Sequence, residues 1–152
     1  MKISTERLIL LPCSSEYVNQ FIEEKYPIGE HIKGHLKELS KDPGQYGWGA
    51  WFVVRKEDGK IIGDAGFKGK PDSMGAIEVG YSIIPLMQKK GYATEAVKKL
   101  IDWAFKENGV SIVKAECMSG NLPSIKVLEK LQLKIVAEDG VLLKWELRNF
   151  LH

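Results

Sequence analysis

Apolar residues recur along this chain with two spacings, one typical of strands and one typical of helices. Short runs rich in Val, Ile, Phe and Trp, such as WFVVR at 51–55 and IEVGYSI at 77–83, predict strands. Between residues 92 and 108 apolar side chains instead recur every three or four positions, as on one buried helix face. Because both patterns alternate along the chain, we expect an α/β protein with helices packed on a mixed sheet.

Proline, glycine and capping residues give the predicted elements their bounds. Pro12 ends the first strand, Glu57-Asp58-Gly59-Lys60 forms a hairpin turn, and Asn108-Gly109 ends the periodic helix. The predicted strands span residues 7–12, 48–56, 61–68, 76–84 and 110–118 with two more in 134–150, and the helices span about 14–25, 30–40, 92–108 and 123–131. The strand–helix–strand unit over 76–118 should be a right-handed parallel crossover. With no repeat or linker in the sequence, residues 1–152 are expected to form a single domain.

Charge and cysteine usage narrow the classes of partner. The formal net charge is +2, and charges of both signs alternate along the chain, so neither a nucleic acid nor a membrane is the expected partner. No apolar run has the length needed to cross a bilayer, and the N-terminus makes a poor signal peptide. Cys13 and Cys117 lie far apart and are expected to be buried free thiols, which favours a cytoplasmic location.

A basic, glycine-containing corner precedes the periodic helix. In QKKGYAT, at 88–94, Gly91 allows close approach of the backbone to a ligand, Ala93 keeps the wall low, and Lys89 and Lys90 add positive charge. The free N–H groups and positive dipole of a helix N-terminus favour phosphate there. Neither the Walker pattern nor a dinucleotide fingerprint is present. The alternative is that Gly91 only shapes the turn between strand and helix.

Several motifs in register along the chain carry a resemblance to a known family. Gln88-x-x-Gly-x-Ala93 is similar to the acyl-CoA pyrophosphate loop of the GNAT superfamily of N-acetyltransferases. The further motifs resemble the branch that acetylates ribosomal-protein N-termini, and they are TERLIL at 5–10, IEVGY at 77–81, GYATEA at 91–96 and NLPSIKVLEK at 121–130. The similarity covers nearly the whole chain. It implies the GNAT acyl-CoA N-acyltransferase fold, a central twisted mixed sheet splayed between its fourth and fifth strands with helices on both faces.

Two positions depart from the family pattern. Gln132-Leu133 stands where the family usually has Gly-Phe, and Lys89 stands where the loop often has glycine. The first change falls in a turn after the last helix. The second is expected to fall at a position without backbone constraint, so neither should remove a group that the chemistry needs.

The resemblance implies acetyl-CoA as co-substrate, no metal, and a small-molecule or peptide amine as acceptor. That amine is a protein N-terminus, an amino acid, a polyamine or a drug, and the protein is expected to be a monomer or a homodimer. Pantetheine would pair with the strand ending at Ile83 and Ile84, with Asn121 on its other side and an N–H near Ile83 as oxyanion donor. The residues that would bind the pyrophosphate are Gln88, Lys89, Lys90, Gly91, Tyr92, Ala93 and Thr94.

Two residues are candidates for proton transfer. Glu78 shares a strand face with Gly80 and Ser82, and these small neighbours leave room for it to act as base. The opposite face, with Ile77, Val79, Tyr81 and Ile83, is expected to be core. Ser124 would protonate the leaving thiolate or only position the thiol; a serine in the first turn of a helix also commonly bonds the backbone. The alternative for Glu78 is a solvated strand carboxylate.

Other features have competing interpretations. His31 and His35 lie four apart with Glu38 on the same face, a spacing that fits a metal site, an exposed helix face or the lining of an amine pocket. The aromatic residues Tyr46, Trp48 and Trp51 suit either strand core or the acceptor pocket, and core is favoured for Trp51 or Phe52. The run 68–70 is expected to be a solvated loop. The second class of function is a non-catalytic acyl-CoA-binding sensor, which would not need Glu78; a nucleic-acid binder using the lysine clusters is disfavoured by the low net charge.

Overall fold

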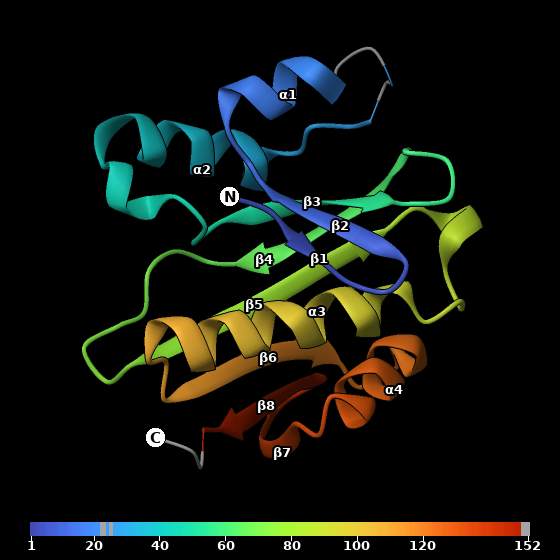
Figure 1. Ribbon diagram of the computed structural model, residues 1–152. Helices are drawn as coiled ribbons and strands as arrows, with labels where there is room; N and C mark the ends of the chain where they lie inside the picture. The colour runs from blue at the N-terminus through green and yellow to red at the C-terminus, as the bar shows by residue number, and fades with distance from the viewer. Residues whose placement is uncertain (22–23, 25, 150–152) are drawn as a thin grey trace.

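One open, eight-stranded sheet organises the molecule (Figure 1). The computed structural model describes residues 1–21, 24 and 26–149. The strands are β1 (Ile3–Ser4), β2 (Leu8–Pro12), β3 (Ala50–Arg55), β4 (Ile61–Phe67), β5 (Ala76–Ile83), β6 (Ile112–Met118), β7 (Lys134–Asp139) and β8 (Leu142–Arg148). Their spatial order is β1-β2-β3-β4-β5-β6-β8-β7, and every neighbouring pair is antiparallel except β5 and β6.

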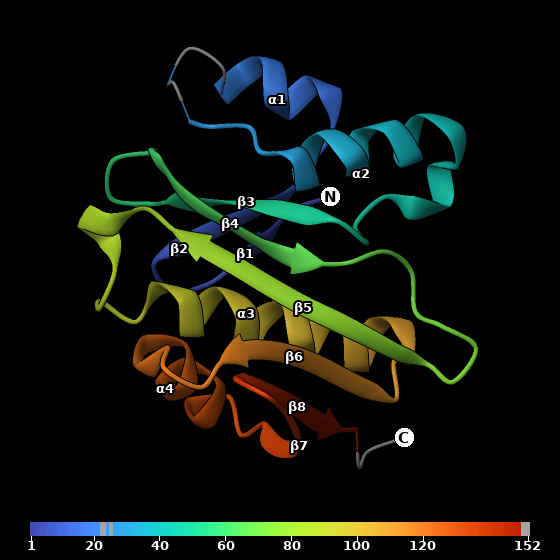
Figure 2. The same ribbon diagram turned by 180° about the vertical axis from the view of Figure 1, so that it is seen from behind.

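Helices cover both faces of this sheet. On one face lie α1 (Ser15–Phe21) and α2 (Glu30–Lys41); on the other lie α3 (Tyr92–Asp102) and α4 (Leu122–Lys130), as the two opposite views show (Figures 1 and 2). A π-helical segment, Trp103–Glu107, continues α3, and two short 3-10 turns cover Pro43–Gln45 and Pro85–Met87. The predicted crossover from β5 through α3 to β6 is present, because β5 and β6 pair in parallel.

Alternation along the strands divides the core between the two faces. In β2, Leu8 and Leu10 are fully buried in the larger core under α3, whereas Leu11 joins the smaller core under α1 and α2. Trp51 and Phe52 show the same division in β3, and both are fully buried. The interpretation of Trp51 and Phe52 as core is therefore confirmed.

The sheet opens between β5 and β6. These strands pair only over Ala76–Glu78 and Ile112–Lys114, whereas β6 and β8 pair along their whole length. Beyond Glu78 the two strands part, so within the described part of the chain the C-terminal half of β5 has no strand neighbour on that side. This is the splay expected between the fourth and fifth strands of the family, which here are β5 and β6 because β1 adds a short edge strand.

The sequence-predicted elements agree with the structure except that the short strand β1 was not predicted and that a few ends differ. The helix expected over 92–108 changes to π-helical geometry at Trp103, and the strand expected from residue 48 begins at Ala50. In the predicted last turn of the first helix, Ile22, Glu23 and Lys25 lie outside the described residues, as does the predicted end of the last strand at Phe150. Within the described residues, no helix has both the length and the apolar character that a membrane span requires.

Among the described residues, two that are not glycine adopt the left-handed backbone conformation that favours glycine. They are Lys89, with φ of 63°, and Gln132, with φ of 69°. Both are positions where the family pattern has glycine. The expectation that Lys89 stands at an unconstrained position is therefore wrong: the turn into the cofactor corner needs positive φ there, and a lysine adopts it at a cost in free energy.

The turn at Gln132 ends α4 with a Schellman motif. The N–H of Gln132 donates to the carbonyl of Glu129 at 2.9 Å, and that of Leu133 donates to Leu128 at 3.1 Å. Leu128 and Leu133 are both buried, which supplies the apolar contact typical of this motif.

Replacing Gln132 by glycine is expected to stabilise the protein. Relief of the left-handed strain should raise the free energy of unfolding by about 1 kcal/mol, partly offset by the greater entropy of glycine in the unfolded chain. For a domain of this size such a change corresponds to a rise in Tm of roughly 2–4 °C. Thermal unfolding of Gln132→Gly and Gln132→Ala measures the effect, because alanine removes the same side chain but keeps the strain. Equal Tm values for the two variants would contradict the assignment.

Candidate active site

The corner at residues 88–94 has the geometry of an anion site. Gly91 is the N-cap of α3, with φ of 83° in the left-handed region. The N–H of Glu95 donates to the carbonyl of Gly91 at 3.0 Å, so the N–H groups of residues 92–94 in the first turn have no partner within the helix. Lys89 and Lys90 are exposed beside them. Backbone donors, a helix dipole and two cations thus converge where the sequence predicts the pyrophosphate.

The N-terminal segment anchors this corner. Glu95, in the first turn of α3, accepts hydrogen bonds from the Thr5 hydroxyl at 2.6 Å, the Arg7 N–H at 2.9 Å and the Arg7 Nε at 2.7 Å. Burial raises the pKa of Glu95, but the bonds from Thr5 and Arg7 outweigh it, so the pKa is lowered and the carboxylate is ionised at neutral pH. Thr5 and Arg7 of the TERLIL motif are therefore bonded to Glu95 of the GYATEA motif, 90 and 88 residues further along the chain.

Arg7 is a site residue that sequence reasoning missed. Its guanidinium donates to the Lys90 carbonyl at 3.0 Å and lies 4.2 Å from the centroid of the Tyr92 ring. A Cβ built on Gly91 would lie 3.3 Å from Arg7 Nη2, so this cation adjoins the predicted phosphate site. The available signal was the arginine in TERLIL, but only the fold brings it to the corner.

Two of the predicted cofactor residues contribute differently from the expectation. Tyr92 turns its side chain into the core, where it is 7 % exposed, so it offers the cofactor only its backbone N–H. Gln88 donates its side-chain amide to the carbonyl of Ile83 at 2.8 Å, so it braces the end of β5. Ala93 and Thr94 are partly exposed in the first turn of α3, as expected.

The open half of β5 presents backbone groups to the gap beside β6. The carbonyl of Glu78 accepts from Lys68 and the N–H of Ile84 donates to Ile62, so even-numbered residues bond toward β4. Because alternate residues of a strand point to opposite sides, the N–H groups of Tyr81 and Ile83 face the gap. Ile83 is thus placed as the sequence predicted. Ile84 must be corrected: its N–H bonds Ile62 and its carbonyl accepts from Met87, so its backbone cannot pair with pantetheine.

The start of α4 forms the other side of the gap. Asn121 caps this helix, its Oδ1 accepting from the N–H of Ser124 at 3.2 Å, which leaves the amide Nδ2 available for a ligand. Tyr81 is partly buried, but its hydroxyl is shielded from solvent and has no hydrogen-bond partner among the described residues. Burial raises the pKa of Tyr81, the nearby Ser124 hydroxyl lowers it, and Cys117 raises it again. Tyr81, expected to be plain core, therefore brings a protonated hydroxyl close to Ser124.

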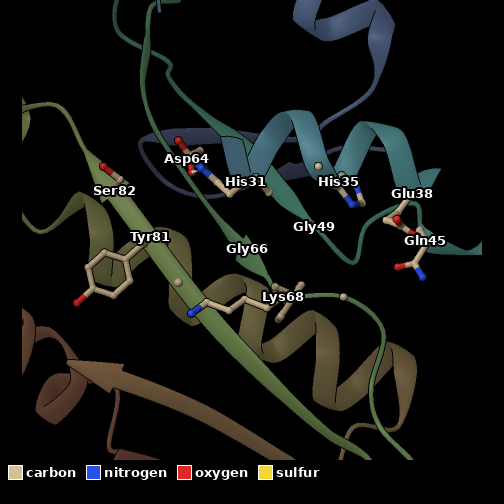
Figure 3. A pocket seen from close by; sticks show the side chains of 15 residues that line it. His31, His35, Glu38, Gln45, Gly49, Asp64, Gly66, Lys68, Tyr81 and Ser82 are labelled. Carbon is tan, nitrogen blue, oxygen red and sulfur yellow. Dashed lines mark hydrogen bonds and ion pairs between the residues drawn. The ribbon is translucent and has the colours of Figure 1, made fainter. Parts of the chain in front are cut away.

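A cleft of roughly 450 Å³ lies between α2 and the β4–β5 pair (Figure 3). Three glycines form much of its floor: Gly49 beside β3, Gly66 on β4 and Gly80 on β5. A Cβ built on Gly49 would collide with the ring of His35, and one on Gly66 would lie 2.1 Å from the Gly49 carbonyl oxygen. The small residues therefore let α2 and its histidines lie close to the sheet. The polar side chains around the cleft are His31, His35, Glu38, Gln45, Asp64, Lys68 and Ser82.

A buried carboxylate lies at one end of the cleft. Asp64, only 6 % exposed, accepts from the Tyr26 hydroxyl at 2.6 Å and contacts His31 Nε2 at 2.9 Å. Burial, followed by the hydrogen bond and charge of Asp64, raises the pKa of Tyr26, so this hydroxyl remains a donor. Sequence reasoning missed Asp64, although a single acidic residue inside the apolar strand IIGDAGF was the available signal.

The two histidines of α2 line the cleft. His31 contacts Asp64, while His35 Nε2 is buried without a hydrogen-bond partner among the described residues. Burial lowers the pKa of His35, which favours its neutral form. In the described part of the chain no three His, Cys, Asp or Glu side chains are grouped to hold a metal ion. Of the interpretations left open for this pair, the geometry matches the lining of a pocket.

Glu78 lies on β5 two residues before Gly80, outside the residues that line the cleft. It is on β5 with Gly80 and Ser82, which line the cleft, but Glu78 itself is bonded to Lys68, with Nζ to Oε2 at 2.5 Å. Its side chain is 29 % exposed. Residues 68–70 were expected to be only a solvated loop. For Lys68 this expectation is wrong, because its side chain lines the cleft and bonds Glu78.

The sequence matches a known family over most of the chain. Residues 6–134 match the family described as the acetyltransferase (GNAT) domain. The chain belongs to the GNAT family and thus to the class of N-acetyltransferases. The resemblance inferred from the sequence motifs is confirmed.

Individual relatives show how much is shared. An uncharacterized N-acetyltransferase of Bacillus subtilis, YjdG, is 35 % identical over 141 residues, which are 86 % of this chain and 84 % of that protein. Another from the same organism, YnaD, is 35 % identical over 146 residues, covering 88 % and 83 % of the two chains. Among solved structures, a ribosomal-protein-S5-alanine acetyltransferase from Vibrio fischeri aligns with a TM-score of 0.76 over 99 % of this chain and 97 % of its own, at 22 % identity. At that identity the likeness establishes the fold.

Proposed function

We propose that the protein transfers an acetyl group from acetyl-CoA to a primary amine by direct attack of the amine on the thioester. The observation that carries this proposal is the opening between β5 and β6, because β5 leads into the anion-binding corner at one end and its residues 80–82 line the cleft under α2. A cofactor held at the corner can extend its arm along the open half of β5. Its thioester would then meet an amine that enters from the cleft on the other side of the same strand.

The cofactor half of the site uses mainly backbone groups. The N–H groups of residues 91–94, with Lys89, Lys90 and Arg7 beside them, would bind the pyrophosphate. The N–H of Ile83 would bond the pantetheine arm or the developing oxyanion, and Asn121 Nδ2 would hold the arm from α4. These donors are fixed by the Gln88–Ile83 bond and by the Glu95 anchor before any ligand binds.

Two proton transfers complete the reaction. Glu78 would accept a proton from the incoming ammonium, since it lies on β5 beside the glycine floor of the cleft. The amine nitrogen then bonds the carbonyl carbon, and the C–S bond breaks. Ser124 would pass a proton to the leaving thiolate. The shielded hydroxyl of Tyr81 lies next to Ser124 and would hold it in position.

One observation favours a second candidate, the non-catalytic acyl-CoA sensor. Lys68 occupies one carboxylate oxygen of Glu78, the proposed base. A non-catalytic protein could keep this ion pair, because it does not need Glu78 to accept a proton. Since the pair is at a partly exposed position, an entering amine can exchange with it at small cost. We therefore rank the enzyme first.

The acceptor is proposed only as an amine whose carrier fits the cleft. Its wall has two histidines and two carboxylates from α2 and β4, which suits a polar acceptor such as a peptide N-terminus, an amino acid, a polyamine or an aminoglycoside drug. We further propose a cytoplasmic protein that acts as a monomer or homodimer.

An acetyl-transfer assay tests the proposal. Purified protein is incubated with acetyl-CoA and, separately, N-terminal peptides, amino acids, polyamines and aminoglycosides, and products are measured by mass because Cys13 and Cys117 are free thiols. The expected result is one added acetyl group on members of one class. Acetyl-CoA that binds, by native mass spectrometry, without transfer to any amine would favour the sensor. Absence of binding would overturn the cofactor site.

A further inference from the structure

The side chain of Lys68 is held directly against the proposed base. Lys68 follows β4 and lies opposite Glu78, because its backbone N–H donates to the Glu78 carbonyl at 3.0 Å. Its Nζ reaches the same residue's Oε2 at 2.5 Å. A substrate ammonium would have to occupy this position for Glu78 to remove its proton.

The lysine also lies over the strand that would carry the thioester. A Cβ built on Gly80 would be 3.8 Å from Lys68 Cε, so the aliphatic stem crosses β5 where that strand has no side chain. Figure 3 shows Lys68 crossing β5 on the side toward Tyr81, whose backbone N–H faces the gap beside β6. The side chain is 64 % exposed and lines the cleft, so it is free to move along β5.

We propose that Lys68 is itself an acetyl acceptor and that the protein modifies its own Lys68 Nζ when the cleft holds no external amine. This inference rests on the proposed function. Glu78 takes one proton from the Lys68 ammonium, and the neutral amine attacks the thioester carbonyl. A C–N bond forms and the C–S bond breaks. The nitrogen loses its second proton as the leaving thiolate gains one, and the proton on Glu78 is released to water. The products are Nε-acetyl-lysine, CoA thiol and one proton.

The modification would change the site that makes it. Acetylation removes the positive charge of Lys68, so the ion pair with Glu78 is lost. The acetyl-lysine would remain beside Gly80 in the cleft. Because donor and acceptor belong to one complex, the reaction is intramolecular and its rate should not depend on protein concentration.

Isotope-labelled acetyl-CoA provides the test. The full-length protein is incubated with acetyl-CoA that carries a heavy acetyl group, at several protein concentrations, and labelled lysines are located by peptide mass spectrometry. Lys70 is the matched internal control, since it lies two residues away and is also paired with a carboxylate, Asp42, at 2.6 Å. The expected result is labelling of Lys68 about tenfold or more faster than Lys70, at a rate independent of protein concentration.

The Glu78→Gln protein distinguishes enzymatic from spontaneous acetylation. It should lose most of the label on Lys68 and keep the slow label on Lys70. The purified wild type could also carry an unlabelled acetyl group on Lys68 from the start. If Glu78→Gln prepared in the same way lacks that group, the observation supports the proposal equally. Equal labelling of both lysines would overturn the proposal.

Assays with external amines separate this inference from the proposed function. Transfer to an external amine with no acetyl group on Lys68 would refute the inference and leave the enzyme assignment intact. No transfer to external amines or to Lys68 would count against the function itself.

Discussion

The Glu78→Gln variant is expected to lose between about a hundredfold and ten-thousandfold of kcat, the usual contribution of a positioned general base. Glutamine keeps the size of the side chain but cannot accept a proton from the acceptor ammonium. The cofactor corner lies at the other end of β5, so the Kd for acetyl-CoA should stay within about twofold of the wild-type value. Steady-state kinetics with the acceptor found in the panel, together with titration of acetyl-CoA, measure both effects.

Two controls separate loss of the base from loss of structure. Glu138→Gln removes a glutamate from the exposed edge strand β7 and should change neither quantity. Thermal unfolding should show Glu78→Gln close to the wild type, since a partly exposed ion pair such as Lys68–Glu78 contributes at most about 1 kcal/mol. Wild-type kcat in a folded Glu78→Gln protein would remove Glu78 from its proposed role.

The second large effect is expected at the cofactor corner. Gly91→Asp places a carboxylate next to the N–H groups of α3 that would bind the pyrophosphate. Two unit charges about 4 Å apart repel by roughly 1–4 kcal/mol between water and the protein surface, so the Kd for acetyl-CoA should rise about fivefold to nearly a thousandfold. Isothermal titration of acetyl-CoA measures the change.

Gly91→Asn is the matched control for this substitution. Asparagine has the same size and also tolerates the left-handed conformation that Gly91 adopts, so it carries the steric cost without the charge. The difference between Asp and Asn therefore reports repulsion from the phosphates, and raising the salt concentration should reduce it. Identical affinities for the two variants would mean that the phosphates bind elsewhere.

The fold was accessible from the sequence because its strands and helices have clear periodicities. The turn at 57–60, the helix over 92–102 and the parallel crossover followed from local patterns, and the motif resemblance supplied the splay between β5 and β6. The corner at 88–94 was accessible too, since the helix N-terminus and its glycine are adjacent in the sequence.

The cleft could be anticipated only in part, because its groups come from distant segments. Asp64 meets His31 and Tyr26 across 33 and 38 residues, and no local pattern pairs them. The role of Lys68 depends on the register of β4 against β5, which places it opposite Glu78. The positive φ of Lys89 was missed for another reason: a lysine gives no sign that the backbone there is left-handed.

The bonds from Thr5 and Arg7 to Glu95 tie the beginning of the chain to the corner that we propose as the acetyl-CoA site. An affinity tag or fusion partner joined close to Met1 could displace this segment. Such a displacement would disturb the bonds to Glu95 and thus the first turn of α3. Acetyl-CoA affinities measured on N-terminally tagged protein should therefore be compared with those of a C-terminally tagged form. The bond between Thr5 and Glu95 could also be used in engineering. Substitutions at Thr5 would change the affinity for the cofactor and leave unaltered the cleft proposed to receive the amine.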